Sequence, residues 1–240
     1  MAKTQRLDKL LSNMGYGTRK EIKGIVKKGW VLVNQNVVKD SSRHVDPYQD
    51  KIIVNGEELI YKEYIYIMMN KPQGVISASF DPRIETVVDL LPEKYQIYDP
   101  FPIGRLDKDT EGLLLISNDG KLSHELLSPK KHIPKTYFAI VDGKVDEEDV
   151  ARFNEGVVLE DGYKTLPGQL RILKSAELSE IELTIYEGKF HQVKRMFLAV
   201  GKTVTYLKRI SMGNLKLDEN LELGEFRELT EEELDILRTR

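Results

Sequence analysis

The sequence contains no cysteine, so disulfide bonds and thiolate metal ligands are excluded. No apolar run approaches the ~18–20 residues that a membrane-spanning helix requires. Neither a glycine-rich nucleotide-binding loop nor an H-E-x-x-H zinc motif occurs along the chain. The N-terminal MAKTQR is cationic, but polar residues interrupt the next segment, so it lacks the apolar core of a secretory signal. We therefore expect a cytoplasmic protein without a metal, a cofactor or a membrane partner.

Length and charge indicate two domains of different character. With 240 residues, of which 40% are hydrophobic and 31% charged, the chain exceeds the usual ~100–150 residues of one globular domain. Its net charge of −3 argues against a uniformly basic nucleic-acid binder. Residues 1–60, however, hold eight Lys and three Arg against seven acidic residues, a net +4 that leaves −7 for the remaining 180 residues. A basic N-terminal module is thus joined to an acidic body.

The N-terminal module shows the pattern of two short helices followed by strands. Four apolar residues at helical spacing define the first helix: Leu7, Leu10, Leu11 and Met14. Thr18 and Glu21 form a capping box at the start of the second helix, and Gly29 ends it. Short β-rich runs bounded by Asn, Asp and Gly then follow between residues 30 and 56.

The cations of this helix pair lie largely off the apolar stripes, where they can form one exposed basic surface. They are Arg6, Lys9, Arg19, Lys20, Lys23, Lys27 and Lys28. A solvated polar face is the alternative, but so many cations in a compact helix pair favour contact with RNA or DNA. The stretch RLDKLLSNMGYGTRKEIKGIVKKGWVLVNQNVV resembles the S4 domain, an RNA-binding module of ribosomal protein S4 and of several RNA-modifying enzymes.

The remaining chain mixes strands and helices without a regular βαβ alternation. Strand-like runs such as GLLLIS, KTYFAIV and EIELTIY dominate it, and short helical patterns appear at 121–127, 145–155, 191–199 and 230–238. We therefore expect an α+β fold with a mainly antiparallel sheet. The change of pattern near 59–64 predicts an S4-like domain at 1–60 and a larger domain at 61–240.

The stretch GRLDKDTEGLLLISNDG at 104–120 places three acids directly before an apolar run. Asp107, Asp109 and Glu111 imitate the start of a calcium loop, but the bidentate Glu expected at position twelve is replaced by Asn118. Turn chemistry, in which a carboxylate accepts from backbone N–H groups, would explain one of these acids. It does not explain why Arg105 precedes Asp107, or why a glycine separates the acids from a strand.

This stretch resembles the signature of the RsuA-type pseudouridine synthases, in which the Asp of G-R-L-D is the catalytic nucleophile. The resemblance implies that role for Asp107. The segments MMNKPQGVISA, KTYFA and EGKFHQVKRMFLAVG agree with the same family in order and spacing, so the likeness covers nearly the whole chain. The forms SPKKHIPKTY, HQVKRMF and FRELTEEEL are most similar to members that act on small-subunit ribosomal RNA, although large-subunit members also resemble the chain.

The segment KTYFAIV is apolar on both alternating faces, which indicates a strand covered on both sides. Tyr137 would then need a partner for its hydroxyl, and a core tyrosine bonded to a carbonyl is the common arrangement. The family resemblance instead implies a tyrosine of the catalytic site, acting as a base or as a ring that stacks on the substrate.

The segment EGKFHQVKRMFLAVG predicts a helix whose first turns are crowded with cations, an arrangement that opposes the helix dipole. Phosphates of RNA or a carboxylate such as Asp107 would offset this charge. Alignment with the family's H-Q-x-[KR] pattern makes Lys194 the partner of Asp107, with Arg195 as the alternative because only one of two adjacent side chains can face it. His191 and Arg195 are expected to contact RNA, His191 having no partner evident in the sequence.

These observations predict an enzyme that isomerises one uridine of small-subunit ribosomal RNA, within an assembly intermediate of that subunit. Asp107, Tyr137 and Lys194 would be catalytic, and Arg105 with the basic surfaces would hold RNA distorted by removal of a base from its stack. A glycosidase would need a second, protonated acid, for which Asp109 or Glu111 is available. A non-enzymatic ribosome-binding protein is the alternative from another class.

Overall fold

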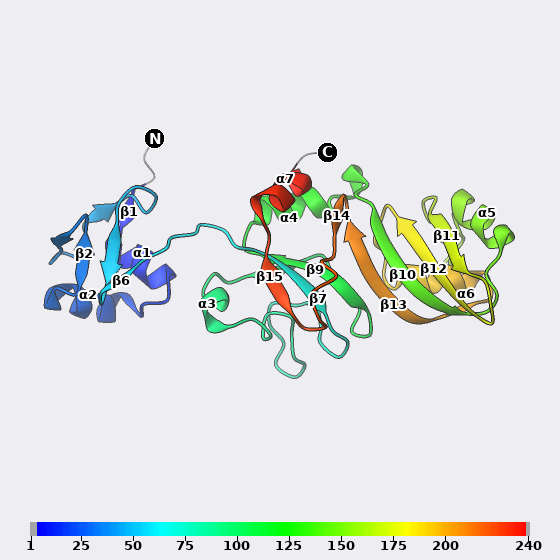
Figure 1. Cartoon of the computed structure of the whole chain (residues 1–240), viewed down its shortest axis with the longest axis horizontal. Helices are drawn as coiled ribbons and strands as arrows, with labels where there is room; N and C mark the ends of the chain where they lie inside the picture. Colours follow the sequence, from blue (N-terminus) through cyan, green and yellow to red (C-terminus); the bar gives the residue numbers. More distant parts are fainter. Residues whose placement is uncertain (1–3, 239–240) are drawn as a thin grey trace. The chain divides into compact units, whose positions relative to one another are not determined.

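The computed structural model describes residues 4–238, and the chain divides into two compact units (Figure 1). The first extends to Ile65 and also includes Pro92–Asp99, whereas the second comprises Tyr66–Leu91 and the chain from Pro100 onward. No helix within residues 4–238 is long and apolar enough to cross a membrane. The expected division into residues 1–60 and 61–240 stays a prediction about which segments fold by themselves.

The first unit packs two helices against small antiparallel sheets. Its elements are β1 (Gln5–Arg6), α1 (Leu7–Asn13), α2 (Arg19–Lys28), β2 (Val31–Val33), β3 (Asn36–Val37), β4 (His44–Val45), β5 (Ile52–Val54), β6 (Glu57–Glu58) and α3 (Glu93–Gln96). The strands pair as β3-β2-β5-β6 and β1-β4. The capping box of α2 is confirmed: the Thr18 hydroxyl accepts from the Glu21 N–H, and Glu21 accepts from the Thr18 N–H at 2.7 Å. Gly29 ends the helix in the left-handed conformation, as the sequence predicts.

The second unit is built on one large sheet. Its elements are β7 (Tyr66–Lys71), β8 (Phe101–Ile103), β9 (Glu111–Ser117), α4 (Gly120–Leu127), a 3-10 turn (Pro129–Lys131), β10 (Lys135–Asp142), α5 (Glu147–Glu155), β11 (Gln169–Lys174), β12 (Leu178–Ile185), α6 (Gln192–Ala199), β13 (Thr203–Met212), β14 (Leu215–Lys216), β15 (Phe226–Glu228) and α7 (Glu231–Arg238). The strand order is β11-β12-β10-β13-β9-β7-β15, with β14 beside β13 and β8 beside β9. All of these pairs are antiparallel except β9 with β13, so the expected α+β class with a mainly antiparallel sheet is confirmed.

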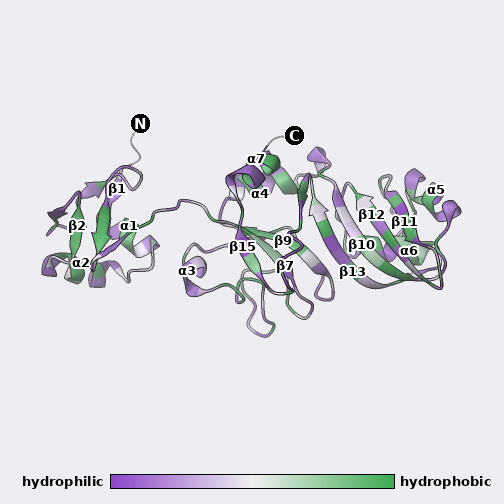
Figure 2. Ribbon diagram, viewed as in Figure 1, coloured by the Kyte–Doolittle hydropathy of each residue, from purple (hydrophilic) through white to green (hydrophobic). Residues whose placement is uncertain are grey.

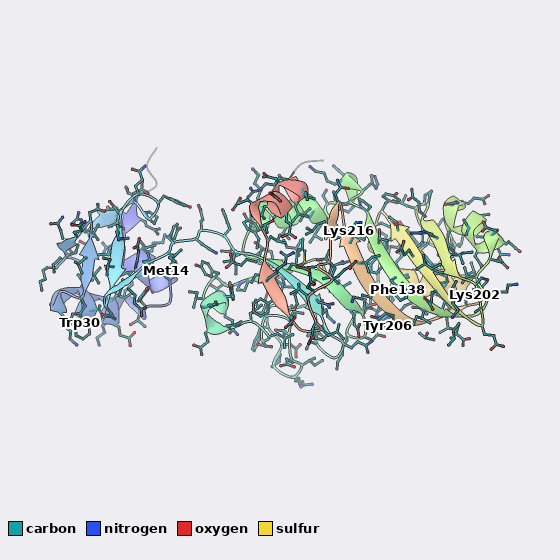
Figure 3. The ribbon with its side chains drawn as sticks, viewed as in Figure 1. Met14, Trp30, Phe138, Lys202, Tyr206 and Lys216 are labelled. Carbon is teal, nitrogen blue, oxygen red and sulfur yellow. The ribbon has the colours of Figure 1, made fainter. Side chains whose placement is uncertain are left out.

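Strand β9 is covered on both sides, because every residue from Glu111 to Ser117 is buried, and so is β7 from Ile67 to Lys71. The same expectation for β10 is wrong. Tyr137, Ala139 and Val141 are buried on one face, whereas Phe138 and Ile140 on the other are only half-buried. Phe138 meets Tyr206 of β13 edge-on, with ring centroids 6.1 Å apart (Figure 3). Figure 2 shows hydrophobic and hydrophilic colours in turn along the strands of this part of the sheet.

The parallel pair β9–β13 is short and joins two halves of the sheet. Only Glu111 and Gly112 pair with Lys208 and Arg209, after which the two strands diverge. Beyond this point β9 continues beside β7, while β13 continues between β10 and β14. The loop that precedes β9, which contains Asp107, therefore lies where the two halves of the sheet meet.

Candidate active site

The backbone of the loop from Gly104 to Thr110 is held by two side chains: Lys71, the last residue of β7, and Ser77, which follows that strand. Lys71 is fully buried, and its ammonium group donates to the carbonyl oxygens of Pro72, Asp107 and Thr110 at 2.9, 3.1 and 3.0 Å. The Ser77 hydroxyl bonds both the N–H and the carbonyl of Leu106 at 3.0 Å. These contacts fix the backbone on both sides of the Asp107 side chain.

Gly112 allows β9 to approach β13 at the end of this loop. Its φ is +102°, and a Cβ added there would lie 2.2 Å from the carbonyl oxygen of Arg209. A side chain at this position would therefore separate the two strands. The close approach of β9 to β13 thus explains why a glycine follows the acidic residues in the sequence.

The Asp107 carboxylate lies beside Lys194 of α6 and His191, the N-cap residue of that helix. Its Oδ2 atom is 3.4 Å from the ammonium nitrogen of Lys194, and its Oδ1 atom is 3.6 Å from Nε2 of His191. The side chain of Asp107 is 28% exposed, so the carboxylate is accessible. The structure therefore brings together the carboxylate and the lysine that the sequence pairs, although 87 residues separate them.

Lys194 is shared between two carboxylates, and its shorter contact is with Asp109 at 2.5 Å. The Lys194 ammonium group holds the pKa of Asp109 below its usual range. Glu111 is buried in β9 and accepts a hydrogen bond of 2.7 Å from the Tyr206 hydroxyl. The three acids thus have different partners, and Asp109 is ill suited to the protonated acid that a glycosidase requires.

His191 has a partner that the sequence did not reveal. It is the N-cap residue of α6 in the left-handed conformation, and this geometry turns its ring toward Asp107. The ring stacks on Phe190, with centroids 3.7 Å apart. The expected RNA contact of His191 stays a prediction.

Arg195 turns away from Asp107. Its guanidinium group donates to Glu160 at 2.7 Å and to Asp161 at 2.5 Å. The alternative in which Arg195 pairs with Asp107 is therefore wrong, because adjacent helical side chains differ by about 100° in direction. The two carboxylates occupy much of the guanidinium, and contact of Arg195 with RNA stays a prediction.

Tyr137 and Asp107 line one cleft of about 1040 Å³ within the second unit. Arg105 lines it too and is exposed, as an RNA-binding residue must be. Tyr137 is 8% exposed, and no hydrogen bond joins its hydroxyl to any residue of the described chain. Tyr137 is therefore not a core tyrosine whose hydroxyl donates to a carbonyl.

Sequence reasoning missed three cations of this region: Lys71, Lys135 and Arg209. Burial lowers the pKa values of Lys71 and Lys135 to about 8 in each case. Arg209 is 2% exposed and donates from Nε to the Leu113 carbonyl at 2.8 Å. The sequence held one signal for Lys71. This lysine directly follows the strand-like run YIYIMMN, and a charged residue that is buried with such a strand must be paired.

In the first unit, the seven predicted RNA-binding cations are all exposed: Arg6, Lys9, Arg19, Lys20, Lys23, Lys27 and Lys28. Arg6 pairs with the buried carboxylate of Asp8 at 2.7 Å, and Lys28 lies 4.6 Å above the Trp30 ring (Figure 3 labels Trp30). Lys20, Lys23 and Lys27 share one exposed face of α2, to one side of the buried stripe of Ile22 and Val26. Their contact with RNA stays a prediction.

Comparison with known proteins decides the family. A sequence model of the family described as "RNA pseudouridylate synthase" matches residues 65–199, more than half of the chain, and the S4 domain model matches residues 5–50. The chain belongs to the RNA pseudouridylate synthase family. It is an RNA pseudouridine synthase with an N-terminal S4 domain, so a non-enzymatic ribosome-binding protein is the wrong interpretation.

Relatives match the enzyme over nearly its whole length. An uncharacterized RNA pseudouridine synthase, YtzG of Bacillus subtilis, is 54% identical, with 97% of this chain and 98% of the relative covered. Ribosomal small subunit pseudouridine synthase A of Vibrio vulnificus is 42% identical over 96% of this chain and 98% of its own. Ribosomal large subunit pseudouridine synthase B of Bacillus subtilis is 39% identical over 98% and 96%. A crystal structure of a pseudouridylate synthase superposes with a TM-score of 0.68 at 36% identity, covering 97% of this chain and 99% of that one.

Proposed function

We propose that the enzyme isomerises one uridine of small-subunit ribosomal RNA, with Asp107 as the nucleophile. The observation that carries this proposal is the accessible Asp107 carboxylate, which lies beside Lys194 and lines the same cleft as Tyr137. A cation at this distance favours the ionised carboxylate that a nucleophile requires. The identity of 42% to a small-subunit enzyme supports that target, and the 39% identity to a large-subunit enzyme defines the alternative.

The reaction begins when the target uridine leaves its stack, at a cost of a few kcal/mol, and enters the cleft. The N1–C1′ bond then breaks and its electron pair goes to the base. Asp107 either attacks C1′ or assists an elimination in which C2′ loses a proton, and the Tyr137 hydroxyl lines the cleft where it can take that proton. The base then turns and C5 bonds to C1′, while the Asp107–C1′ bond breaks or, on the elimination route, C2′ regains its proton. C5 finally loses its proton and N1 gains one, so the product is an isomer of the substrate.

RNA contacts divide between the two units in this proposal. The exposed cations of α2 in the first unit contact phosphates without reading the sequence, and Arg105 at the cleft stabilises the distorted strand. The substrate is an assembly intermediate of the small subunit, whose incomplete packing leaves the target uridine accessible. Cytoplasmic location follows from that substrate.

A pseudouridine map of both ribosomal RNAs from cells that lack the gene tests the proposal. We expect one site to disappear from the small-subunit RNA, to return with a wild-type copy, and to stay absent with an Asp107→Asn copy. A missing site in the large-subunit RNA would establish the alternative target. Purified enzyme should modify partly assembled small subunits faster than naked RNA. Faster modification of naked RNA would show that the assembly intermediate is not the substrate.

A further inference from the structure

Two cations in the cleft lack a counterion. Arg209 is almost fully buried, and its Nη2 atom has no hydrogen-bond partner among residues 4–238. Half-buried Lys135 donates to the Ile133 carbonyl at 3.0 Å, and neither cation forms an ion pair with a carboxylate of the described chain. Removing a cation from water without an anionic partner is unfavourable, so a partner from outside the chain is expected.

Lys135, Tyr137 and Arg209 line the same part of the sheet. Tyr137 of β10 and Arg209 of β13 are direct cross-strand partners, and Lys135 lies two residues before Tyr137. Burial and, second, the positive charge of Arg209 lower the pKa of Lys135 to about 8. Arg209 also spans the point where β9 and β13 diverge, through its bond to the Leu113 carbonyl.

The carboxylates that line the cleft are engaged elsewhere. Asp107 faces Lys194 and His191. Glu187 accepts from the Tyr163 hydroxyl at 2.6 Å, the Leu166 N–H at 2.9 Å and the Gln192 amide at 3.0 Å. Neither carboxylate therefore pairs with Lys135 or Arg209, and the cleft offers these two cations to a ligand.

We propose that Lys135 and Arg209 hold a carbonyl oxygen of the target uracil and stabilise the negative charge that the base acquires when its bond to the sugar breaks. In that step the N1–C1′ electron pair goes to uracil, whose charge spreads from N1 onto the carbonyl oxygens. The charge disappears when C5 bonds to C1′ and the ring returns to a neutral form on loss of the C5 proton and protonation of N1. Buried donors fixed in advance stabilise such charge more strongly than solvent-exposed ones.

Burial favours the base over a phosphate as the ligand. Arg105 and Lys189 are exposed at the same cleft and are suited to phosphates on the RNA surface. Lys135 and Arg209 instead flank the buried ring of Tyr137, where only a base removed from its stack can reach them. The inference rests on the isomerisation of uridine and concerns the leaving base, whereas the proposed role of Asp107 concerns the sugar.

The experiment compares two RNA substrates that carry uridine or 5-fluorouridine at the target position. The fluorine makes the departing base less basic, so cleavage depends less on stabilisation by the protein. We would measure, at saturating enzyme, the single-turnover rate at which the intact target nucleoside disappears, together with RNA affinity. The variants are Lys135→Met, Arg209→Lys and, as a matched control, Lys216→Met at an exposed position of β14 (Figure 3).

We expect Lys135→Met to slow the uridine reaction by about 10²-fold, as loss of one preorganised donor does, with RNA affinity unchanged. The defect should shrink at least about tenfold with 5-fluorouridine, and Lys216→Met should react like wild type with both substrates. An equal defect with both substrates would overturn the inference. So would weaker RNA binding with an unchanged rate at saturation, which is the result expected for a phosphate contact.

Arg209→Lys keeps the positive charge, so this variant should retain a higher rate than Lys135→Met, whatever its stability. Asp107→Asn should fail equally with both substrates, so a failure of this inference leaves the role of Asp107 separately testable.

Discussion

The cations of the two units differ in what surrounds them. In the first unit, Lys20, Lys23 and Lys27 are exposed on the outer face of a helix whose apolar side completes a local core. In the second unit, Lys71 and Arg209 are buried, and all but one of the carbonyls to which they donate lie 36 to 96 residues away in the chain. Exposed cations can attract any phosphate backbone, whereas buried ones act only on groups that enter their site. We therefore predict that the first unit supplies RNA affinity and that the second carries out the chemistry.

Among the substitutions that test this comparison, we expect the one at Tyr137 to change the reaction rate most. Tyr137→Phe keeps the buried ring and removes the hydroxyl, which has no partner in the described chain. If the hydroxyl is a general base, single-turnover pseudouridine formation should fall by about 10²–10⁴-fold with RNA affinity unchanged. Tyr206→Phe is the matched control, because its hydroxyl bonds Glu111 outside the cleft. A Tyr137→Phe enzyme with the wild-type rate would show that Tyr137 acts only through packing.

Loss of the Lys71 ammonium group should weaken the loop that carries Asp107. Lys71→Met leaves three backbone carbonyls without this donor, and an unsatisfied buried group costs roughly 1–3 kcal/mol. We expect a lower free energy of unfolding in urea and a lower turnover rate. Lys108→Met, an exposed lysine of the same loop, should change neither quantity. Unchanged stability of Lys71→Met would show that the buried contacts do not hold the loop.

Lys194 should affect both the rate and its pH dependence. Lys194→Met removes the cation between Asp107 and Asp109, and we expect turnover to fall about 10–100-fold, equivalent to roughly 1.4–2.8 kcal/mol. The pH at which activity appears should rise, because the carboxylates lose the cation that favours their ionised form. Lys194→Arg should restore part of the rate. A pH–rate profile that is identical to wild type would exclude Lys194 as the partner of the nucleophile.

The smallest effect on chemistry is expected from the first unit. Changing Lys20, Lys23 and Lys27 together to Gln should lower the slope of log affinity against log salt by about 0.7–0.9 for each lost phosphate contact. The rate at saturating enzyme should not change. The matched control neutralises exposed lysines of the second unit: Lys121, Lys144 and Lys174. An unchanged slope in the first triple variant, or a reduced saturated rate, would break the division between the units.

Local patterns predicted much of the first unit and the strands of the second. The helical stripe of Leu7 and Leu10, the capping box of Thr18 and the stop at Gly29 depend on neighbours within a few residues, so the sequence displays them. The buried strand β9 was equally visible as a continuous apolar run.

Long-range pairing explains what the sequence could not reveal. The parallel register of β9 with β13 brings Arg209 to Gly112, and no local pattern encodes that meeting. The approach of His191 to Asp107 depends on a left-handed backbone at the start of α6. The sequence predicted that both faces of β10 are covered, but one face is only half-buried. The pattern of residues along a strand shows which of them are apolar, and not which other elements cover them. Roles assigned through the family resemblance, including those of Asp107 and Tyr137, stay predictions.

The most direct test of the account is single-turnover pseudouridine formation by Asp107→Asn and Asp109→Asn, measured with RNA affinity in the same preparations. Both changes remove one carboxylate charge near Lys194, but only Asp107 is proposed to react with the sugar. The account predicts no product above background with Asp107→Asn at near wild-type affinity, and a clearly active Asp109→Asn enzyme. A nearly normal rate with Asp107→Asn, or an inactive Asp109→Asn beside an active Asp107→Asn, would contradict it.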